Sequence, residues 1–274
     1  MINQHVKAVA FKALHTAPQA FIIPNPWDAG SAKLLASLGF EALATSSGAS
    51  AATLGRRDGQ ITFDEAIAHA KMIVDATDLP VSADLEKGFG NSPADVARAV
   101  LRAAEIGLVG CSIEDATGDP HRPLFDCGHA TERIAAAVEA ARSLPFSFTL
   151  TARSENFLRG NPDLADTIAR LQAYEQAGAD VLFAPALPTL DAVREVCRAV
   201  SKPVNFMVAI RGRSFSVAEL AGVGVKRISL ASSLYKAAMT GLLNAAKEVR
   251  EVGTFGYLET TLTTPELNAF LAEP

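Results

Sequence analysis

Residues 80–91 read PVSADLEKGFGN, and residues 108–115 read LVGCSIED. Each stretch begins as a short apolar run that leads into carboxylates, which are Asp84 and Glu86 in the first stretch and Glu114 and Asp115 in the second. Short apolar runs of this kind are typical of the buried strands of a parallel sheet. A helix-like segment with a serine cap at its start and a glycine at its end connects them. The two stretches therefore predict a strand–helix–strand unit whose strands lead into acids.

The same pattern recurs along the whole chain. Eight short apolar runs alternate with helix-like segments, and several of the runs lead into an acid or an arginine. Eight such units predict a closed α/β barrel of the (β/α)₈ TIM type, in which functional residues lie at the carboxyl ends of the strands. The runs are Phe21–Pro24, Ala42–Ser46, Pro80–Ala83, Leu108–Ile113, Phe146–Thr151, Asp180–Phe183, Pro203–Val208 and Arg227–Ala231.

A doubly wound nucleotide-binding sheet is the competing arrangement. Such a sheet carries a GxGxxG phosphate loop after its first strand, whereas the loop here reads NPWDAGSA, at residues 25–32. We therefore predict a single barrel domain over residues 1–274, of which residues 232–274 form a C-terminal helical extension.

Composition limits the class of protein. The chain has 274 residues and is 49% hydrophobic, which is ample for a core. A net charge of −5 without a basic stripe argues against nucleic-acid binding, and no apolar run approaches the ~20 residues that span a bilayer. Three cysteines (Cys111, Cys127 and Cys197) fit a reducing compartment without disulfides, and the N-terminal residues lack the apolar core of a signal peptide. We expect a cytoplasmic protein.

The acids that follow the third and fourth runs are the strongest candidate site. Alternate residues of a strand point to the same side, so Asp84 and Glu86 are expected together, beside Glu114 at the end of the next strand. Carboxylate oxygens suit Mg²⁺ or Mn²⁺. Each acid alone fits a solvated loop equally well, but three at adjacent strand ends favour a metal site.

Three other features fit substrate binding, each with a simpler alternative. Arg153, at the end of the fifth run, suits a bidentate contact with a substrate carboxylate, or a salt bridge to Glu155 or to a metal-site acid. Asn205 is a polar residue in an apolar run, and so is either a ligand contact or a hydrogen-bonded core amide. The small residues 45–49 expose backbone amides that suit a carboxylate or enolate oxygen, or form an ordinary loop.

The longest strand-to-helix connection is ATGDPHRPLFDCGHA, at residues 116–130. Long loops of this kind are commonly functional, and we expect a lid over residues 116–129. Within it, Cys127 and His129 look like a nucleophile or an acid/base pair.

In order and spacing, the motifs NPWDAGSA, ADLEKGFGN, SIEDATGD, TARSENFLRG and GVKRISLASSL resemble the isocitrate lyase / phosphoenolpyruvate mutase superfamily over roughly residues 20–245. Asp-x-Glu-x-Gly-Phe-Gly followed by Ile-Glu-Asp is specific for that superfamily. The resemblance implies a (β/α)₈ barrel that binds Mg²⁺ (or Mn²⁺) and a 2-oxo acid or its enolate. It also implies homodimers or homotetramers that exchange a C-terminal helix, here from Ser232 onward.

The resemblance also assigns roles to individual residues. Asp84, Glu86 and Glu114 match the acids around the metal, and Asp58 matches an acid that reaches the metal or substrate through water. Arg153 matches an arginine that contacts the substrate. The residues that match substrate-binding segments are Trp27, Asp28, Thr45, Ser46 and Ser47.

The lid departs from the best-known members of the superfamily. The isocitrate and methylisocitrate lyases carry Lys-[Lys/Arg]-Cys-Gly-His eight to nine residues after the metal-site glutamate, whereas Cys127-Gly128-His129 lies thirteen residues after Glu114. We interpret it as a chance similarity. The Lys-x-Asn-Ser run of phosphoenolpyruvate mutases is also absent. The chain therefore resembles the methylisocitrate-lyase-like or carboxyphosphonate-mutase-like branch, with His121 and Arg122 as candidates for lid chemistry.

The function that this resemblance implies is Mg-dependent cleavage of a C–C bond in a 2-oxo or 2-hydroxy carboxylate through a metal-stabilised enolate. The reaction would be similar to that of a 2-methylisocitrate lyase or an oxaloacetate decarboxylase. The same enolate serves C–P bond enzymes such as a phosphonopyruvate hydrolase or a phosphoenolpyruvate/carboxyphosphonate phosphorylmutase, and a non-catalytic keto-acid binder is a further alternative. A phosphate-binding aldolase fits the sequence less well. AIRGRS at residues 209–214 is only a weak match to a phosphate-binding loop, and no strand carries a lysine for a Schiff base.

Overall fold

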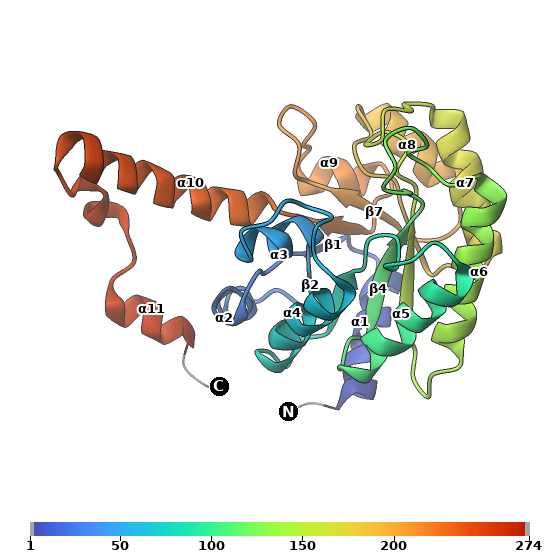
Figure 1. Cartoon of the computed structure of the whole chain (residues 1–274), viewed down its shortest axis with the longest axis horizontal. Coiled ribbons are helices and arrows are strands. Elements are labelled where there is room, and N and C mark those ends of the chain that lie inside the picture. Colours follow the sequence, from blue (N-terminus) through green and yellow to red (C-terminus); the bar gives the residue numbers. More distant parts are fainter. Residues whose placement is uncertain (1–2, 272–274) are drawn as a thin grey trace.

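The computed structural model describes residues 3–271 and shows eight parallel strands that curl into a barrel with helices around it (Figure 1). The strand order is β1-β8-β7-β6-β5-β4-β3-β2, and Ala44 N donates to Pro24 O (3.0 Å) between the two remaining edges. This cyclic order lacks the reversal of a doubly wound sheet, so the predicted barrel is confirmed. Residues 1–2 and 272–274 of the predicted single domain lie outside the described residues.

Each predicted run overlaps one strand, and β3, β4 and β5 extend past the predicted ends of their runs to Asp84, Glu114 and Arg153. The strands are β1 (Phe21–Ile23), β2 (Leu43–Ala44), β3 (Val81–Asp84), β4 (Gly110–Glu114), β5 (Thr149–Arg153), β6 (Val181–Phe183), β7 (Val204–Met207) and β8 (Arg227–Ser229). The barrel helices are α1 (Gln4–Thr16), α2 (Ala29–Ser37), α3 (Ser47–Thr53), α4 (Phe63–Asp75), α5 (Pro93–Glu105), α6 (Cys127–Arg142), α7 (Leu164–Gln176), α8 (Leu190–Ala199) and α9 (Val217–Gly222). Across residues 3–271, no helix combines the length and the apolar character that a bilayer crossing requires. All three cysteines are free thiols.

Local sequence sets where the helices begin. The Ser92 side chain accepts a hydrogen bond from Asp95 N, and the Asp95 side chain accepts one from Ser92 N, which forms a capping box at the start of α5. Pro93 occupies the first turn, where its missing N–H costs no hydrogen bond. One face of α5, including Val96 and Val100, is buried against the barrel. Residues 62–65 read TFDE, a Thr-x-x-Glu pattern that predicts a capping box, and this box is present at the start of α4.

The buried face of α1 differs from the predicted one. The spacing of apolar residues predicts burial of Val6 and Val9, but their side chains are 54% and 53% exposed. The helix instead buries the face that carries Phe11 and His15, because Phe11 reaches the barrel beside Gly110, where a Cβ would lie 3.0 Å from the Phe11 ring. Apolar spacing allows either face, and contact with the barrel selects this one.

The loop between β4 and α6 is shorter than predicted. The sequence suggests a helix from Thr131, but α6 begins at Cys127, with Asp126 as its N-cap. Asp126 Oδ1 accepts a hydrogen bond from Gly128 N (2.9 Å), which stabilises the earlier start. Cys127 and His129 therefore belong to the first helical turn rather than to the lid.

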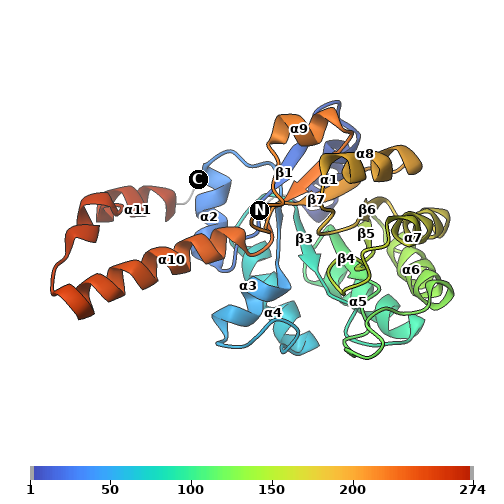
Figure 2. The same ribbon diagram turned by 90° about the horizontal axis from the view of Figure 1, so that it is seen from above.

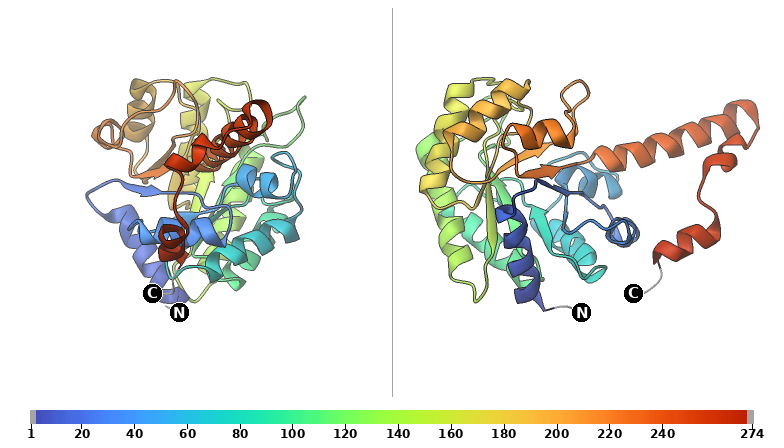
Figure 3. Two further views of the ribbon diagram at one scale, coloured as in Figure 1. Left: turned by 90° about the vertical axis from the view of Figure 1, so that its left-hand side faces the viewer. Right: turned by 180° about the vertical axis from the view of Figure 1, so that it is seen from behind.

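The C-terminal segment forms an arm that projects from the barrel. The helix α10 (Ser233–Lys247) leads into a π-helical turn, η1 (Glu248–Val252), then η2 (Gly256–Thr260) and α11 (Thr264–Leu271). α10 extends away from the strands and buries none of its residues, and the chain then returns toward α2 (Figures 2 and 3). Large apolar side chains of the arm are exposed: Met239, Leu242, Leu243, Val249, Val252, Phe255, Leu258, Leu262 and Leu267.

Candidate active site

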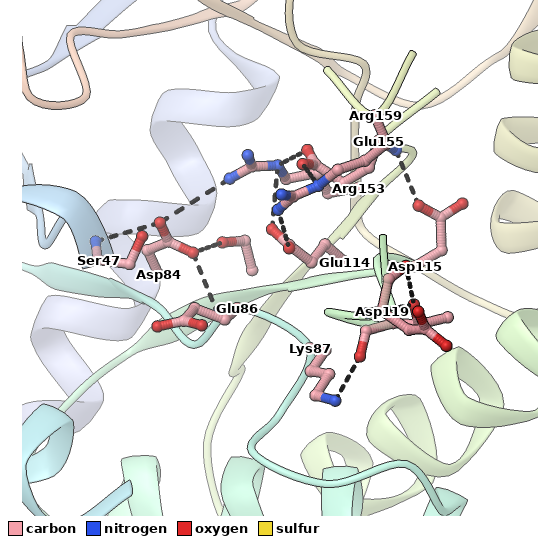
Figure 4. Close-up of polar contacts among 12 residues, drawn as sticks. Ser47, Asp84, Glu86, Lys87, Glu114, Asp115, Asp119, Arg153, Glu155 and Arg159 are labelled. Carbon is pink, nitrogen blue, oxygen red and sulfur yellow. Dashed lines mark hydrogen bonds and ion pairs between the residues drawn. The ribbon is translucent and has the colours of Figure 1, made fainter. Parts of the chain in front are cut away.

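Arg153 lies at the centre of an acidic cluster at the carboxyl ends of β3, β4 and β5 (Figure 4). Its Nε is 2.5 Å from Glu155 Oε1 and 3.5 Å from Glu114 Oε2. Its Nη1 is 3.8 Å from Asp84 Oδ2. The side chain is only 13% exposed, so this guanidinium is an internal counter-charge to three carboxylates. The salt-bridge alternative considered for Arg153 is thus present, and the charge faces the strand ends where a substrate would lie.

A second arginine, which the sequence analysis did not single out, completes the cluster. Arg159 Nη2 lies 3.2 Å from Glu114 Oε1, and Arg159 Nε lies 3.1 Å from Glu155 Oε2. Glu155 is fully buried and bridges the two arginines. The available signal was the i,i+4 spacing of Glu155 and Arg159 directly after a strand end.

Asp84 is held by two backbone amides, one at the start of α3 and one in the turn after β3. Its Oδ2 accepts a hydrogen bond from Ser47 N (3.3 Å), and its Oδ1 accepts one from Glu86 N (3.2 Å). The Thr45 hydroxyl accepts a hydrogen bond from Asp84 N (3.0 Å). The segment after β2 therefore lies against the acidic cluster, although its Ser47 amide already donates to a carboxylate.

Glu86 occupies a turn rather than a strand. β3 ends at Asp84, and Glu86 has a left-handed backbone with φ of 50°, so the predicted strand alternation does not place its side chain. A non-glycine residue in this region is strained, and such strain is concentrated at functional sites. Glu86 Oε1 is buried and has no hydrogen-bond partner among residues 3–271.

The pKa values show that negative charge is in excess. Burial, followed by the charges of Asp84 and Asp58, raises the pKa of Glu86 to about 7. Burial, followed by the charge of Glu155, raises the pKa of Glu114 to about 8, although Arg153 opposes the shift. Burial alone would lower the pKa of Arg153, but the surrounding carboxylates outweigh it and raise that pKa. The cluster therefore favours an added positive charge or a bound proton.

Two cavities meet at Arg153. A small one of about 40 Å³ extends into the barrel and is lined by Thr45, Ser46, Asp84 and Arg153 among others. An outer one of about 390 Å³ is lined by Ser47, Asp58, Gly59, Glu86, Lys87, Glu114, Ala116, Gly118, Arg153 and Arg159. A larger cavity of about 600 Å³ lies near α1 and contains no predicted site residue. The pair at Arg153 lies at the strand ends where barrel enzymes carry their chemistry.

The donor set of the outer cavity fits a divalent cation, although no three His, Cys, Asp or Glu side chains in the described part of the chain converge as a ready-made metal site. Five carboxylates (Asp58, Asp84, Glu86, Glu114 and Glu155) face three cations (Lys87, Arg153 and Arg159), which leaves two negative charges when all are ionised. Lys87 Nζ also donates to Thr117 O (2.6 Å), which ties it to the lid. Oxygen ligands and the unpartnered Glu86 Oε1 are what Mg²⁺ or Mn²⁺ requires.

Three predicted substrate-binding residues make contacts within the protein. Asp28 is the N-cap of α2 and accepts a hydrogen bond from Ser31 N (2.7 Å). Trp27 packs edge-on against Tyr235, with 5.5 Å between the ring centroids. Asn205 donates to Ser229 Oγ (3.0 Å) and accepts from Arg227 Nε (2.9 Å), which is the core-amide alternative. None of the three lines either cavity at Arg153, and their substrate roles stay predictions.

The predicted lid residues lie at the edge of the site. His121 and Arg122 are exposed on the loop and line neither cavity. The loop is closed by a bridge between Ala116 and Leu124, and Phe125 N donates to Asp115 O (2.9 Å). On α6, His129 Nε2 lies 2.9 Å from Asn91 O, so its ring contacts a neighbouring loop rather than the acids.

Comparisons with known proteins agree with this geometry. The family model described as phosphoenolpyruvate phosphomutase matches residues 11–250. The 2-methylisocitrate lyase of Escherichia coli (strain K12) is 30% identical over 263 residues, which cover 92% of this chain and 88% of that protein.

Two solved structures share the fold over nearly the whole chain. A protein of Burkholderia cenocepacia J2315, named provisionally as a lyase/mutase, is 52% identical with a TM-score of 0.97, covering 99% of this chain and 97% of that one. A 2,3-dimethylmalate lyase, itself a member of the PEP mutase/isocitrate lyase superfamily, is 26% identical with a TM-score of 0.87, covering 99% and 96%. The barrel, the acidic strand ends and these matches together identify the chain as a lyase that belongs to the phosphoenolpyruvate mutase/isocitrate lyase superfamily.

Proposed function

We propose that this enzyme cleaves a C–C bond of a 2-oxo or 2-hydroxy carboxylate in a reaction that depends on Mg²⁺ or Mn²⁺. The observation that carries the proposal is the placement of Arg153 among Asp84, Glu114 and Glu155, beside a cavity with excess negative charge. A site built only to bind a carboxylate would not concentrate acids in this way, because like charges repel.

Asp84, Glu86 and Glu114 would hold the cation, directly or through water. When bound, the cation would supply Lewis-acid polarisation of the carboxylate and 2-oxygen of the substrate. Asp58 lines the same cavity and adds negative charge beside Glu86, which is consistent with a contact through water.

The remaining residues would bind and orient the substrate. Arg153 would pair with a substrate carboxylate once the cation shares the acids that now surround the guanidinium. The Ser47 amide and the Thr45 hydroxyl lie beside Asp84, and Ser46 lies between them. This segment, Thr45 to Ser47, would stabilise negative charge that develops when the C–C bond breaks. The loop of residues 115–126, which Lys87 anchors at Thr117, would exclude water, with His121 and Arg122 as the candidates for lid chemistry.

A coupled assay tests the proposal. Oxaloacetate, methylisocitrate, isocitrate and phosphonopyruvate would each be incubated with the enzyme, with Mg²⁺ or with EDTA. Release of the 2-oxo acid product, which is glyoxylate from isocitrate and pyruvate from the other three, would be followed by NADH oxidation with lactate dehydrogenase. Metal-dependent release from one of the three C–C substrates supports the proposal. Release from phosphonopyruvate alone would instead favour a C–P bond enzyme, and tight binding of pyruvate or oxalate without any turnover would favour a non-catalytic binder.

The arm supports a second proposal, about assembly. Leu242 and Leu243 on α10 are 61% and 53% exposed, and an apolar surface of this extent marks an interaction site. We propose that α10 packs against a second copy of the chain by exchange of the helix, which gives a homodimer or a homotetramer. The molar mass in solution tests this directly.

A further inference from the structure

The interior of the barrel contains a guanidinium without an acidic partner. Arg227 begins β8, is 5% exposed, and donates from Nε to Asn205 Oδ1 (2.9 Å). Its Nη1 is buried without any hydrogen-bond partner, and no carboxylate in residues 3–271 forms an ion pair with it. Burial lowers the pKa of Arg227 to about 10, which still leaves the group charged at neutral pH.

Neighbouring groups do not supply the missing negative charge. Asn205 is neutral and satisfied by Ser229. His15 is itself driven toward the neutral form, because burial and then the charge of Arg227 lower its pKa to about 3. Asp84 lines the same small cavity, but its oxygens accept from Ser47 N, Glu86 N and the Ser112 hydroxyl. An isolated buried charge costs several kcal/mol, so the charge of Arg227 calls for a compensating negative charge.

The small cavity offers room and donors for a counter-ion. It measures about 40 Å³, and Arg227 and Ser82 both line it. Ser82 is 3% exposed, and its hydroxyl makes no hydrogen bond with residues 3–271. This hydroxyl is therefore a second free donor. A water needs roughly 10–15 Å³ of such space, so a monoatomic anion with one or two waters fits, whereas a sulfate or phosphate does not.

We propose that the interior of this barrel binds a halide-sized monovalent anion, with chloride as the physiological occupant, held by Arg227 Nη1 and the Ser82 hydroxyl. The anion would neutralise Arg227 beneath the catalytic cavity and fill a void that otherwise weakens the barrel. The anion would share the small cavity with Asp84 and Arg153, but its role is structural, because it neutralises Arg227 and takes no part in bond cleavage. The experiment therefore measures the thermal stability of the protein and the diffraction signal of the bound anion, and not turnover.

The experiment uses the full-length protein in two ways. Crystals grown or soaked in bromide would be examined by anomalous diffraction, and a bromide peak within contact of Arg227 Nη1 is expected. In parallel, Tm would be measured as chloride replaces gluconate, an anion too large for the cavity, at constant ionic strength. At about ten times its dissociation constant, chloride should raise Tm by roughly 3 °C.

Variants identify the residue responsible. R227M should abolish the chloride effect on Tm, while R211M, which removes an exposed arginine, should retain it. If R227M does not fold, S82A keeps the charge and should weaken chloride binding several-fold. A cavity that holds only water in the bromide crystals, or a chloride effect that persists unchanged in R227M and S82A, would overturn the proposal.

Discussion

Glu114 and Arg153 are register partners at the ends of β4 and β5, with 3.5 Å between Glu114 Oε2 and Arg153 Nε. The pairing places a carboxylate and a guanidinium side by side where two strands leave the barrel. Arg153 also reaches Glu155 and approaches Asp84. Its guanidinium therefore connects acids that lie at the ends of three successive strands. Its removal should affect both stability and function.

We predict that Arg153→Met abolishes turnover and lowers the free energy of unfolding by about 3–5 kcal/mol, because buried carboxylates lose their partner. Urea unfolding and the coupled assay measure the two effects. Arg159→Met is the matched control. Its side chain is 44% exposed, so we expect a loss nearer 1 kcal/mol. Equal losses from the two substitutions would show that Arg153 is not the central counter-charge.

The raised pKa values of Glu86 and Glu114 predict that the stability of the metal-free protein depends on pH. A bound metal ion should remove this dependence. The pKa of Glu86 rises from 4.5 to about 7 and that of Glu114 from 4.5 to about 8, so the folded protein binds more protons than the unfolded chain. The stabilisation that these two carboxyl groups give the metal-free protein is therefore fully present below pH 4.5, and it is lost as the pH rises toward 8.

With EDTA, Tm should fall between pH 5 and 8, and Mg²⁺ should flatten the profile because a cation replaces the bound protons. Glu86→Gln should reduce the slope in EDTA, while Glu132→Gln, on the surface of α6, should not. A profile that Mg²⁺ leaves unchanged would contradict the metal assignment.

Behind the site, Tyr174 donates to Asp115 Oδ2 (2.7 Å), and Glu155 N donates to Asp115 Oδ1 (2.8 Å). Tyr174→Phe removes one of the two donors to Asp115 Oδ2 and leaves Arg170 as the other. We expect a loss of about 1–3 kcal/mol in the free energy of unfolding, measured by urea titration. Unchanged stability would mean that water replaces the hydroxyl without cost.

The assembly proposal predicts that Leu242→Glu combined with Leu243→Glu converts the oligomer to monomers, because charge would be buried in the interface. Light scattering after size-exclusion chromatography gives the molar mass. Leu101→Glu changes an exposed leucine of α5 and should leave the molar mass unaltered. A wild-type protein that is already monomeric would rule out the exchange of α10.

Strand positions were predictable because each run of apolar residues had to be buried, and the caps at Thr62 and Ser92 marked where helices begin. The acids at Asp84 and Glu114 followed from the same logic, since a residue next to a strand end lies at the rim of the barrel.

Features that depend on tertiary contacts were not predictable in this way. The left-handed turn at Glu86 and the burial of Phe11 beside Gly110 depend on neighbours that are distant in sequence. Asp28 caps α2, a contact that the sequence analysis did not consider although a short polar side chain before a helix is suited to it, and its substrate role stays a prediction. Arg159 was missed because its sequence signal, the i,i+4 spacing from Glu155, points to the site only once Glu155 is known to be buried among the acids.

The most direct test of the central claim compares metal occupancy with turnover in one sample. Mn²⁺ would be titrated into metal-free enzyme, bound ions counted by electron paramagnetic resonance, and cleavage of the best substrate followed in parallel. We predict that the rate rises in proportion to occupancy, saturates at about one ion per chain, and is lost together with binding in Asp84→Asn. Full turnover in the metal-free enzyme, or in Asp84→Asn, would contradict the account.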